Sequence, residues 1–237
     1  MKSYLAAATL CLGLAVTSAP ALAATYSDAT LEGSIVTMWP HLDISSVEVN
    51  NTATALSFKI NLVGNPVTTD WGKYLIGIDS ISGGDTAGNG WNRPIGMSSG
   101  MDYFVGSWVD AGNGAEIRKW NGTSWTLQSA TYNPNPDSLA ISKNASSVTL
   151  TFDMAGLGLS SGSIFSFDLY SSGGGGSDSA IDALFNPNQT VADWPNNYNS
   201  GNLVGSFTIQ AIPEPSTFAL AGLGLLVLLS RRAKFTD

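Results

Sequence analysis

The chain has 237 residues, of which 18 are acidic and 10 are basic, and its formal net charge at pH 7 is −8. This charge argues against nucleic acid as a partner, because the phosphate backbone attracts positively charged surfaces. The single cysteine, Cys11, excludes an intramolecular disulfide and any site built from several thiolates.

The N-terminus of the chain has the three parts of a secretory signal peptide. Lys2 gives a positively charged start, residues 4–16 are apolar, and Ala21 and Ala23 frame an A-x-A cleavage site. We therefore expect signal peptidase to cut after Ala23 during export through the inner membrane. The cysteine lies inside the apolar part, so the processed chain is expected to contain none.

The body of the chain has the pattern of β-strands. Runs rich in Val, Ile, Phe, Tyr and Trp are separated by Gly, Asn, Asp and Pro, and no long stretch has the period of an amphipathic helix. Strands are expected at residues 44–49, 55–63, 73–78, 101–109, 115–120, 125–130, 147–154, 164–170 and 203–210. Residues 177–185 are compatible with one short helix. The pattern predicts an all-β fold, an antiparallel β-sandwich of jelly-roll type.

The C-terminal residues combine three features in a fixed order. They are a stiff polar hinge, an apolar block and a basic pair: Pro213, Glu214 and Pro215, then residues 218–230, then Arg231 and Arg232. As a helix the apolar block would span roughly 20 Å, whereas the hydrocarbon core of a bilayer is about 30 Å thick. The block is therefore short for a permanent transmembrane helix, although it can enter a membrane.

This tail closely resembles the PEP-CTERM sorting signal of Gram-negative bacteria. The resemblance implies recognition by an exosortase, cleavage near Pro-Glu-Pro after a transient stay in the inner membrane, and delivery to the cell surface or the medium. It also implies an association with exopolysaccharide or extracellular matrix. A plain C-terminal anchor and a buried helix remain as alternatives. The chain thus divides into a signal peptide (1–23), a β-sandwich domain (24–211) and a sorting signal (212–237).

The body resembles the β-sandwich carbohydrate-binding and DOMON-like modules of secreted bacterial proteins. The resemblance is carried by residues 56–58, 74–79, 100–104 and 120–125. It implies a sandwich fold and sugar binding, and it provides no binding triad that can be transferred to this sequence.

Tryptophan is the residue type that best suits a sugar-binding surface, because flat aromatic rings can stack on sugar faces. All seven tryptophans lie in the body. We expect Trp108 and Trp120 to belong to the core. Trp71, Trp91 and Trp194 have loop residues as neighbours, and we expect them to form a surface platform for sugar.

A structural Ca²⁺ ion is the one cofactor that the sequence suggests. Asp79, Asp85 and Asp102 flank one glycine-rich loop system, and Asp178 and Asp182 flank another. Oxygen ligands on such loops suit Ca²⁺, although the spacing of an EF-hand is missing. Asp79, Asp85 and Asp102 are the candidate metal ligands.

The candidate catalytic motifs in the sequence lack the partner residues or the structural context that their chemistry requires. Residues 158–162 match the G-x-S-x-G elbow, but a strand is expected after them and the only histidine, His41, lies upstream. No pair of carboxylates stands out as the acid and base of a glycosidase. We therefore expect a non-enzymatic protein, and the resemblance of the tail implies that it is a surface protein associated with exopolysaccharide. The alternative is a carbohydrate-binding module proper, and a polysaccharide hydrolase is the least favoured.

Overall fold

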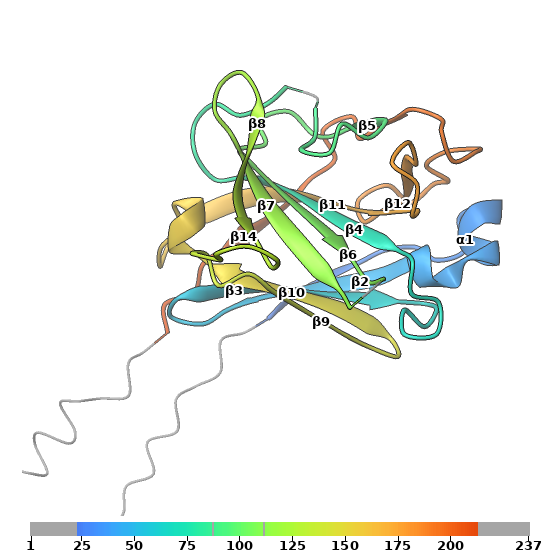
Figure 1. Cartoon of the computed structure of the whole chain (residues 1–237), viewed down its shortest axis with the longest axis horizontal. Helices are drawn as coiled ribbons and strands as arrows, with labels where there is room; N and C mark the ends of the chain where they lie inside the picture. The colour runs from blue at the N-terminus through green and yellow to red at the C-terminus, as the bar shows by residue number, and fades with distance from the viewer. Residues whose placement is uncertain (1–22, 87, 111, 213–237) are drawn as a thin grey trace, which may run out of the picture. The chain divides into compact units, whose positions relative to one another are not determined.

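The computed structural model describes residues 23–86, 88–110 and 112–212, which fold into two antiparallel β-sheets packed face to face (Figure 1). The prediction of an all-β antiparallel sandwich is confirmed. Within the described ranges there is one α-helix, α1 (Ser34–Met38), and two 3₁₀ turns, Pro40–Leu42 and Ala155–Leu157.

Both predicted targeting segments fall largely outside the described residues. This applies to the apolar part of the signal peptide with Ala21, and to the whole hinge, apolar block and basic pair from Pro213 to Arg232. In the part of the chain that is described, no helix has the length and apolar character needed to cross a membrane.

The five-stranded sheet has the strand order β1-β2-β3-β10-β9. Its strands are β1 (Ala24–Ser27), β2 (Ile44–Asn51), β3 (Ala55–Leu62), β10 (Ser147–Asp153) and β9 (Ala140–Asn144). In β3 the alternate residues Leu56, Phe58, Ile60 and Leu62 are buried, and the residues between them are only partly buried. One face of this sheet therefore supplies the core, as the alternation of the sequence predicts.

The seven-stranded sheet has the order β12-β11-β4-β6-β7-β8, and β14 pairs with β11 as well. Its strands are β12 (Ala180–Ala183), β11 (Ile164–Ser172), β4 (Lys73–Asp79), β6 (Tyr103–Trp108), β7 (Gly114–Trp120), β8 (Trp125–Ala130) and β14 (Gly205–Thr208). A separate pair of two-residue strands, β5 (Ile95–Gly96) and β13 (Tyr198–Asn199), is parallel.

The short helix expected at residues 177–185 is wrong. Ala180–Ala183 instead forms β12, whose Ala183 lies opposite Tyr170 of β11. All four residues of the strand are buried. Hydrogen bonds to a neighbouring strand and burial outweigh the local preference for a helix, and neither can be read from nearby sequence.

The seven-stranded sheet has an apolar layer on each face. Its inner face packs against the five-stranded sheet, and there the ring of Phe58 contacts Phe165 and Phe167, with centroids 6.3 and 5.2 Å apart. The outer face is covered by the loop segments that carry β5 and β13, which supply Ile95, Met97 and Tyr198; in Figure 1, β5 lies on the side away from β3 and β10. Coverage on both faces explains why β4 is apolar at nearly every position.

Candidate ligand-binding face

Six aromatic rings lie in a continuous row on the outer face of β6, β7 and β8. In order, they are Tyr132, Trp108, Trp91, Phe104, Trp125 and Trp120, with neighbouring centroids 6.1, 6.4, 5.5, 6.3 and 5.6 Å apart. We call these six side chains the aromatic row. Phe104 is buried and the other five are partly or largely exposed. The row can therefore meet a ligand along most of its length.

Two glycines on adjacent strands make room for the row. A Cβ atom on Gly106 of β6 would overlap the ring of Trp91, and a Cβ atom on Gly114 of β7 would overlap the ring of Trp108. Both indoles therefore lie directly over bare backbone. A side chain at either glycine would have to push an indole off the sheet.

The carboxylate of Glu116 holds the middle of the row in place. Its Oε2 accepts hydrogen bonds from Trp91 Nε1 at 3.0 Å and from Arg118 Nε at 2.9 Å, and its Oε1 accepts one from the hydroxyl of Tyr132. Burial alone would raise the pKa of Glu116, but the hydrogen bonds from Tyr132, Trp91 and Arg118 outweigh it and leave the pKa below its ordinary value. Glu116 is therefore an ionised anchor for two rings.

Two adjoining clefts lie beside one end of the row. The first has a volume of about 380 Å³ and is lined by Trp120, Trp125, Asp85 and Arg118, among others. The second, of about 470 Å³, shares Gly88, Asn89 and Asn92 with the first and adds Asn197 and Asn199. Both volumes are within the range of roughly 300–1,000 Å³ that is typical of ligand pockets. Amide side chains can donate and accept hydrogen bonds, which suits a ligand rich in hydroxyl groups.

The three tryptophans expected to form a platform are divided between two places. Trp91 belongs to the aromatic row, whereas Trp71 and Trp194 pack together with centroids 5.9 Å apart. Trp71 also packs against Trp39 at 5.1 Å and against His41 at 4.4 Å. Aromatic contacts among the described residues do not join Trp91 to the other two.

The expectation that Trp108 and Trp120 belong to the core is wrong, because both are partly exposed. A signal for this was present in the sequence. Trp120 is in phase with Glu116 and Arg118 along β7, and not with the buried Ile117. Residues of one strand that are two positions apart share a face, so the polar neighbours place Trp120 on the outer side.

Asp79, Asp85 and Asp102 do not come together as a set of metal ligands. Asp102 Oδ2 accepts the backbone N–H groups of Ser80 and Ile81, at 3.0 and 2.8 Å, and so closes the turn after β4. Asp85 accepts the indole N–H of a tryptophan of the row. Burial, followed by the charge of Asp102, raises the pKa of Asp79.

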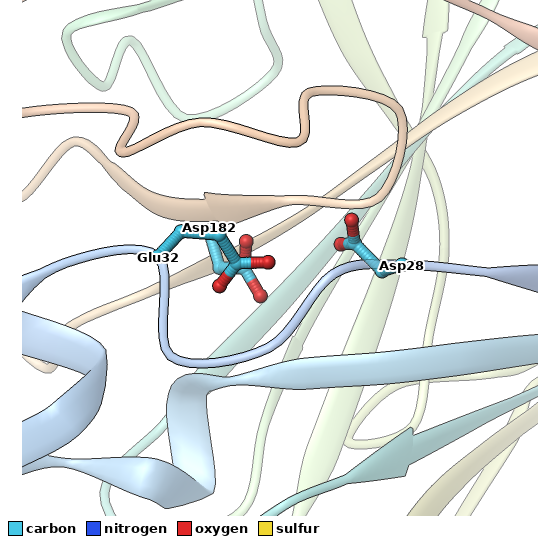
Figure 2. Close-up of side chains that lie close together, drawn as sticks. All are labelled: Asp28, Glu32 and Asp182. Atoms are coloured by element: carbon cyan, nitrogen blue, oxygen red, sulfur yellow. The ribbon is translucent and has the colours of Figure 1, made fainter.

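A different group of carboxylates does converge. Oxygens of Asp28, Glu32 and Asp182 all lie within 4.8 Å of one another (Figure 2). Burial, and then the charges of Asp182 and Glu32, raise the pKa of Asp28 to about 9. Burial likewise raises the pKa of Asp182 to about 7. The sequence did not indicate this group, because its members come from segments far apart in the chain.

The comparison with protein families identifies a sorting motif near the C-terminus. Residues 211–233 match the model of the PEP-CTERM protein-sorting motif. The chain carries a PEP-CTERM sorting signal. The matched range includes all five residues named for the hinge and the basic pair, Pro213, Glu214, Pro215, Arg231 and Arg232. The PEP-CTERM motif implies that an exosortase processes the protein, and that it is exported to the surface or the medium. A comparison with curated proteins found no match.

Proposed function

We propose that this protein is a non-enzymatic surface protein whose β-sandwich binds the sugar chains of exopolysaccharide through the aromatic row. The sorting signal would deliver the domain to the place where such chains are found. The observation that carries the proposal is the row itself, a line of six rings with amide-lined clefts at one end.

The chemistry of the face fits a polymer of sugars. The apolar C–H faces of sugar rings pack on aromatic rings, and their hydroxyl groups pair with amides, guanidinium groups and carboxylates. A line of rings repeats the same contact, as the units of a polymer do. The net charge of −8 favours a neutral chain over an acidic one, since like charges repel at long range.

The absence of enzymatic activity remains part of the proposal, and two features support it. Glu116 is held ionised by three donors, so it is poorly suited to act as a general acid. His41 is 1 % exposed, and burial lowers its pKa to about 4. Its ring packs against Trp71, outside the row and its clefts.

The alternative is a carbohydrate-binding module that uses the other tryptophans. Trp39, Trp71 and Trp194 form a second group of partly exposed indoles. This group has fewer rings than the row, and neither of the two clefts described above is lined by it.

The test is a binding assay with the full chain, purified in a mild detergent. The probes are the exopolysaccharide isolated from the producing cells, cellulose as a neutral reference and alginate as an acidic one. We expect binding to the exopolysaccharide and to cellulose. The double substitution Trp120→Ala and Trp125→Ala should weaken that binding at least tenfold. The scale is taken from nucleic-acid complexes, where the stacking of one base on an aromatic side chain contributes about 1–3 kcal/mol.

The matched control is Trp194→Ala, which removes a partly exposed indole outside the row and should leave binding unchanged. Loss of binding in Trp194→Ala but not in the double variant would overturn the proposal that sugar binds on the aromatic row, and would favour the second group of indoles. A preference for alginate would contradict the choice of a neutral chain. Release of reducing ends from any of the three probes would contradict the non-enzymatic assignment.

A further inference from the structure

The convergent carboxylates lie where the first part of the domain meets β12. Asp28 and Glu32 belong to the segment between β1 and α1, and Asp182 belongs to β12. In Figure 2 the carboxylates of Glu32 and Asp182 lie side by side, and that of Asp28 faces them from across a gap. Asp182 is only 2 % exposed, and Asp28 and Glu32 are partly buried, so the group is partly enclosed by the fold.

A fourth carboxylate, that of Asp43, borders the same group from the start of β2. Its side chain is 0 % exposed. Oδ2 accepts the backbone N–H of Leu31 at 3.0 Å, which places the carboxylate against the segment that carries Asp28 and Glu32. The next residue, Ile44, donates its N–H to Asp182 Oδ2 at 2.6 Å. Asp43 is therefore hydrogen-bonded to the segment that carries Asp28 and Glu32, and its neighbour in the chain, Ile44, is hydrogen-bonded to Asp182.

Four buried oxygen atoms, three in this group and one on the adjacent Asp43, have no hydrogen-bond partner. They are Asp28 Oδ2, Glu32 Oε1, Glu32 Oε2 and Asp43 Oδ1. The ion pairs found among the described residues, which join Lys59 to Glu48, Lys73 to Asp110 and Arg118 to Glu116, include none of the four acids. Buried charges are normally paired or bound to a metal ion. Oxygens that converge without a donor or a cation are thus in the state expected of metal ligands.

A small cavity adjoins the group. It has a volume of about 10 Å³ and is lined by Glu32 and Asp182, together with Gln189 and Asn188. This is close to the space that one water molecule occupies on the same measure. The cavity therefore has room for a single ion, and it is too small for an organic ligand.

We propose that Asp28, Glu32 and Asp182 bind one Ca²⁺ ion beside the buried Asp43, and that this ion fastens the segment between β1 and α1 to β12. Calcium accepts six to eight oxygen ligands in flexible geometry, and several carboxylates with mono- or bidentate contacts provide them. Magnesium demands a stricter octahedron and usually keeps several waters. Zinc favours nitrogen and sulfur ligands, and the group contains neither.

The test is calorimetric titration of the full chain with CaCl₂ after treatment with EDTA. We expect one Ca²⁺ per chain and a rise in the melting temperature on binding. Glu32→Gln is the first variant, because neither oxygen of Glu32 has a hydrogen-bond partner and the substitution breaks no bond that folding uses. It should weaken Ca²⁺ binding at least about tenfold, a loss that even outer-shell residues can cause.

Asp70→Asn is the matched control, since it removes one negative charge from an exposed side chain outside the group and should bind Ca²⁺ as the wild type does. Asp182→Asn is the second variant, and it should also lose binding. The proposal would be overturned if the wild-type chain takes up no Ca²⁺ at millimolar concentration, or if Glu32→Gln binds as tightly as Asp70→Asn. Equal affinity for Mg²⁺ would overturn the assignment to calcium. The outcome is independent of sugar binding, because the aromatic row contributes no ligand.

Discussion

The indole Nε1 of Trp125 donates a hydrogen bond of 2.8 Å to Oδ2 of Asp85. The donor is on β8, and the acceptor is in the loop between β4 and β6, which is held by a bond from the Asp85 N–H to the carbonyl of Met101 at 2.9 Å. The other carboxylate oxygen of Asp85 accepts the N–H of Thr86. An aspartate that the sequence suggested as a metal ligand thus orients a ring of the aromatic row.

Replacing Asp85 with alanine should therefore weaken sugar binding without unfolding the domain. The substitution leaves Trp125 Nε1 without its acceptor, and a hydrogen bond to a charged group contributes about 1.5–3 kcal/mol. Because the site is only partly buried, we expect roughly a three- to tenfold loss of affinity for the exopolysaccharide, measured by titration. Asp85→Asn keeps an acceptor at the same place and should retain most of the affinity. Equal losses in both variants would show that the hydrogen bond does not position the ring.

Gly106→Ala should disturb both stability and the row. The added methyl group overlaps the ring of Trp91 on a central strand. Overpacking of this kind costs about 1–3 kcal/mol, which should appear as a lower midpoint of denaturant unfolding. The control is Gly176→Ala, where a Cβ atom meets nothing within 4 Å and the backbone does not have a positive φ. A change in midpoint that is the same for both variants would contradict the close approach of Trp91.

The stability of the domain should depend on pH through its only histidine. Burial lowers the pKa of His41 to about 4, whereas in the unfolded chain the ordinary value is 6.5. As the pH falls from 6.5 to 4, the unfolded state gains a proton that the folded state does not, so the free energy of unfolding decreases. At about 1.4 kcal/mol per pKa unit, the loss is on the order of 3 kcal/mol.

His41→Phe isolates this contribution. The variant keeps a ring against Trp71 but does not titrate. Acids whose pKa is raised by burial, such as Asp168 with a pKa of about 6, act in the opposite direction, because they stabilise the folded state as the pH falls. These acids are the same in both proteins. The change in unfolding free energy between pH 7 and pH 4.5 is therefore measured for each protein, and the difference between the two changes reports His41. Parallel pH profiles for the wild type and the variant would show that His41 does not carry the effect.

The core between the sheets should depend strongly on Phe58. This side chain is 0 % exposed and contacts Phe152, Phe165 and Phe167. Phe58→Ala should lower the free energy of unfolding by about 3–5 kcal/mol. Ile164→Ala is the contrast, because Ile164 is 68 % exposed on β11 and should change stability by less than about 0.5 kcal/mol. Both values can be measured by denaturant unfolding, and similar losses would contradict the assignment of the core.

Nine of the strands and the sorting signal could be predicted from the sequence, because both depend on local patterns, whereas β1, β9 and β12 were not predicted. The bounds of β8 agree with the prediction, and those of β2, β3 and β10 differ by no more than two residues at either end, since alternating burial leaves its mark residue by residue. The sorting signal is recognised as a linear motif, so it does not need a folded context.

Only the tertiary structure decided which side chains meet. The strand β12 exists because β11 lies beside it, and the aromatic row exists because a loop places Trp91 over a glycine of β6. In the acidic group, Asp182 meets residues from the start of the domain, and it also accepts a hydrogen bond from Ile44, which is 138 positions away in the chain. Such contacts depend on sheet order and loop paths, and short-range sequence patterns carry no record of them.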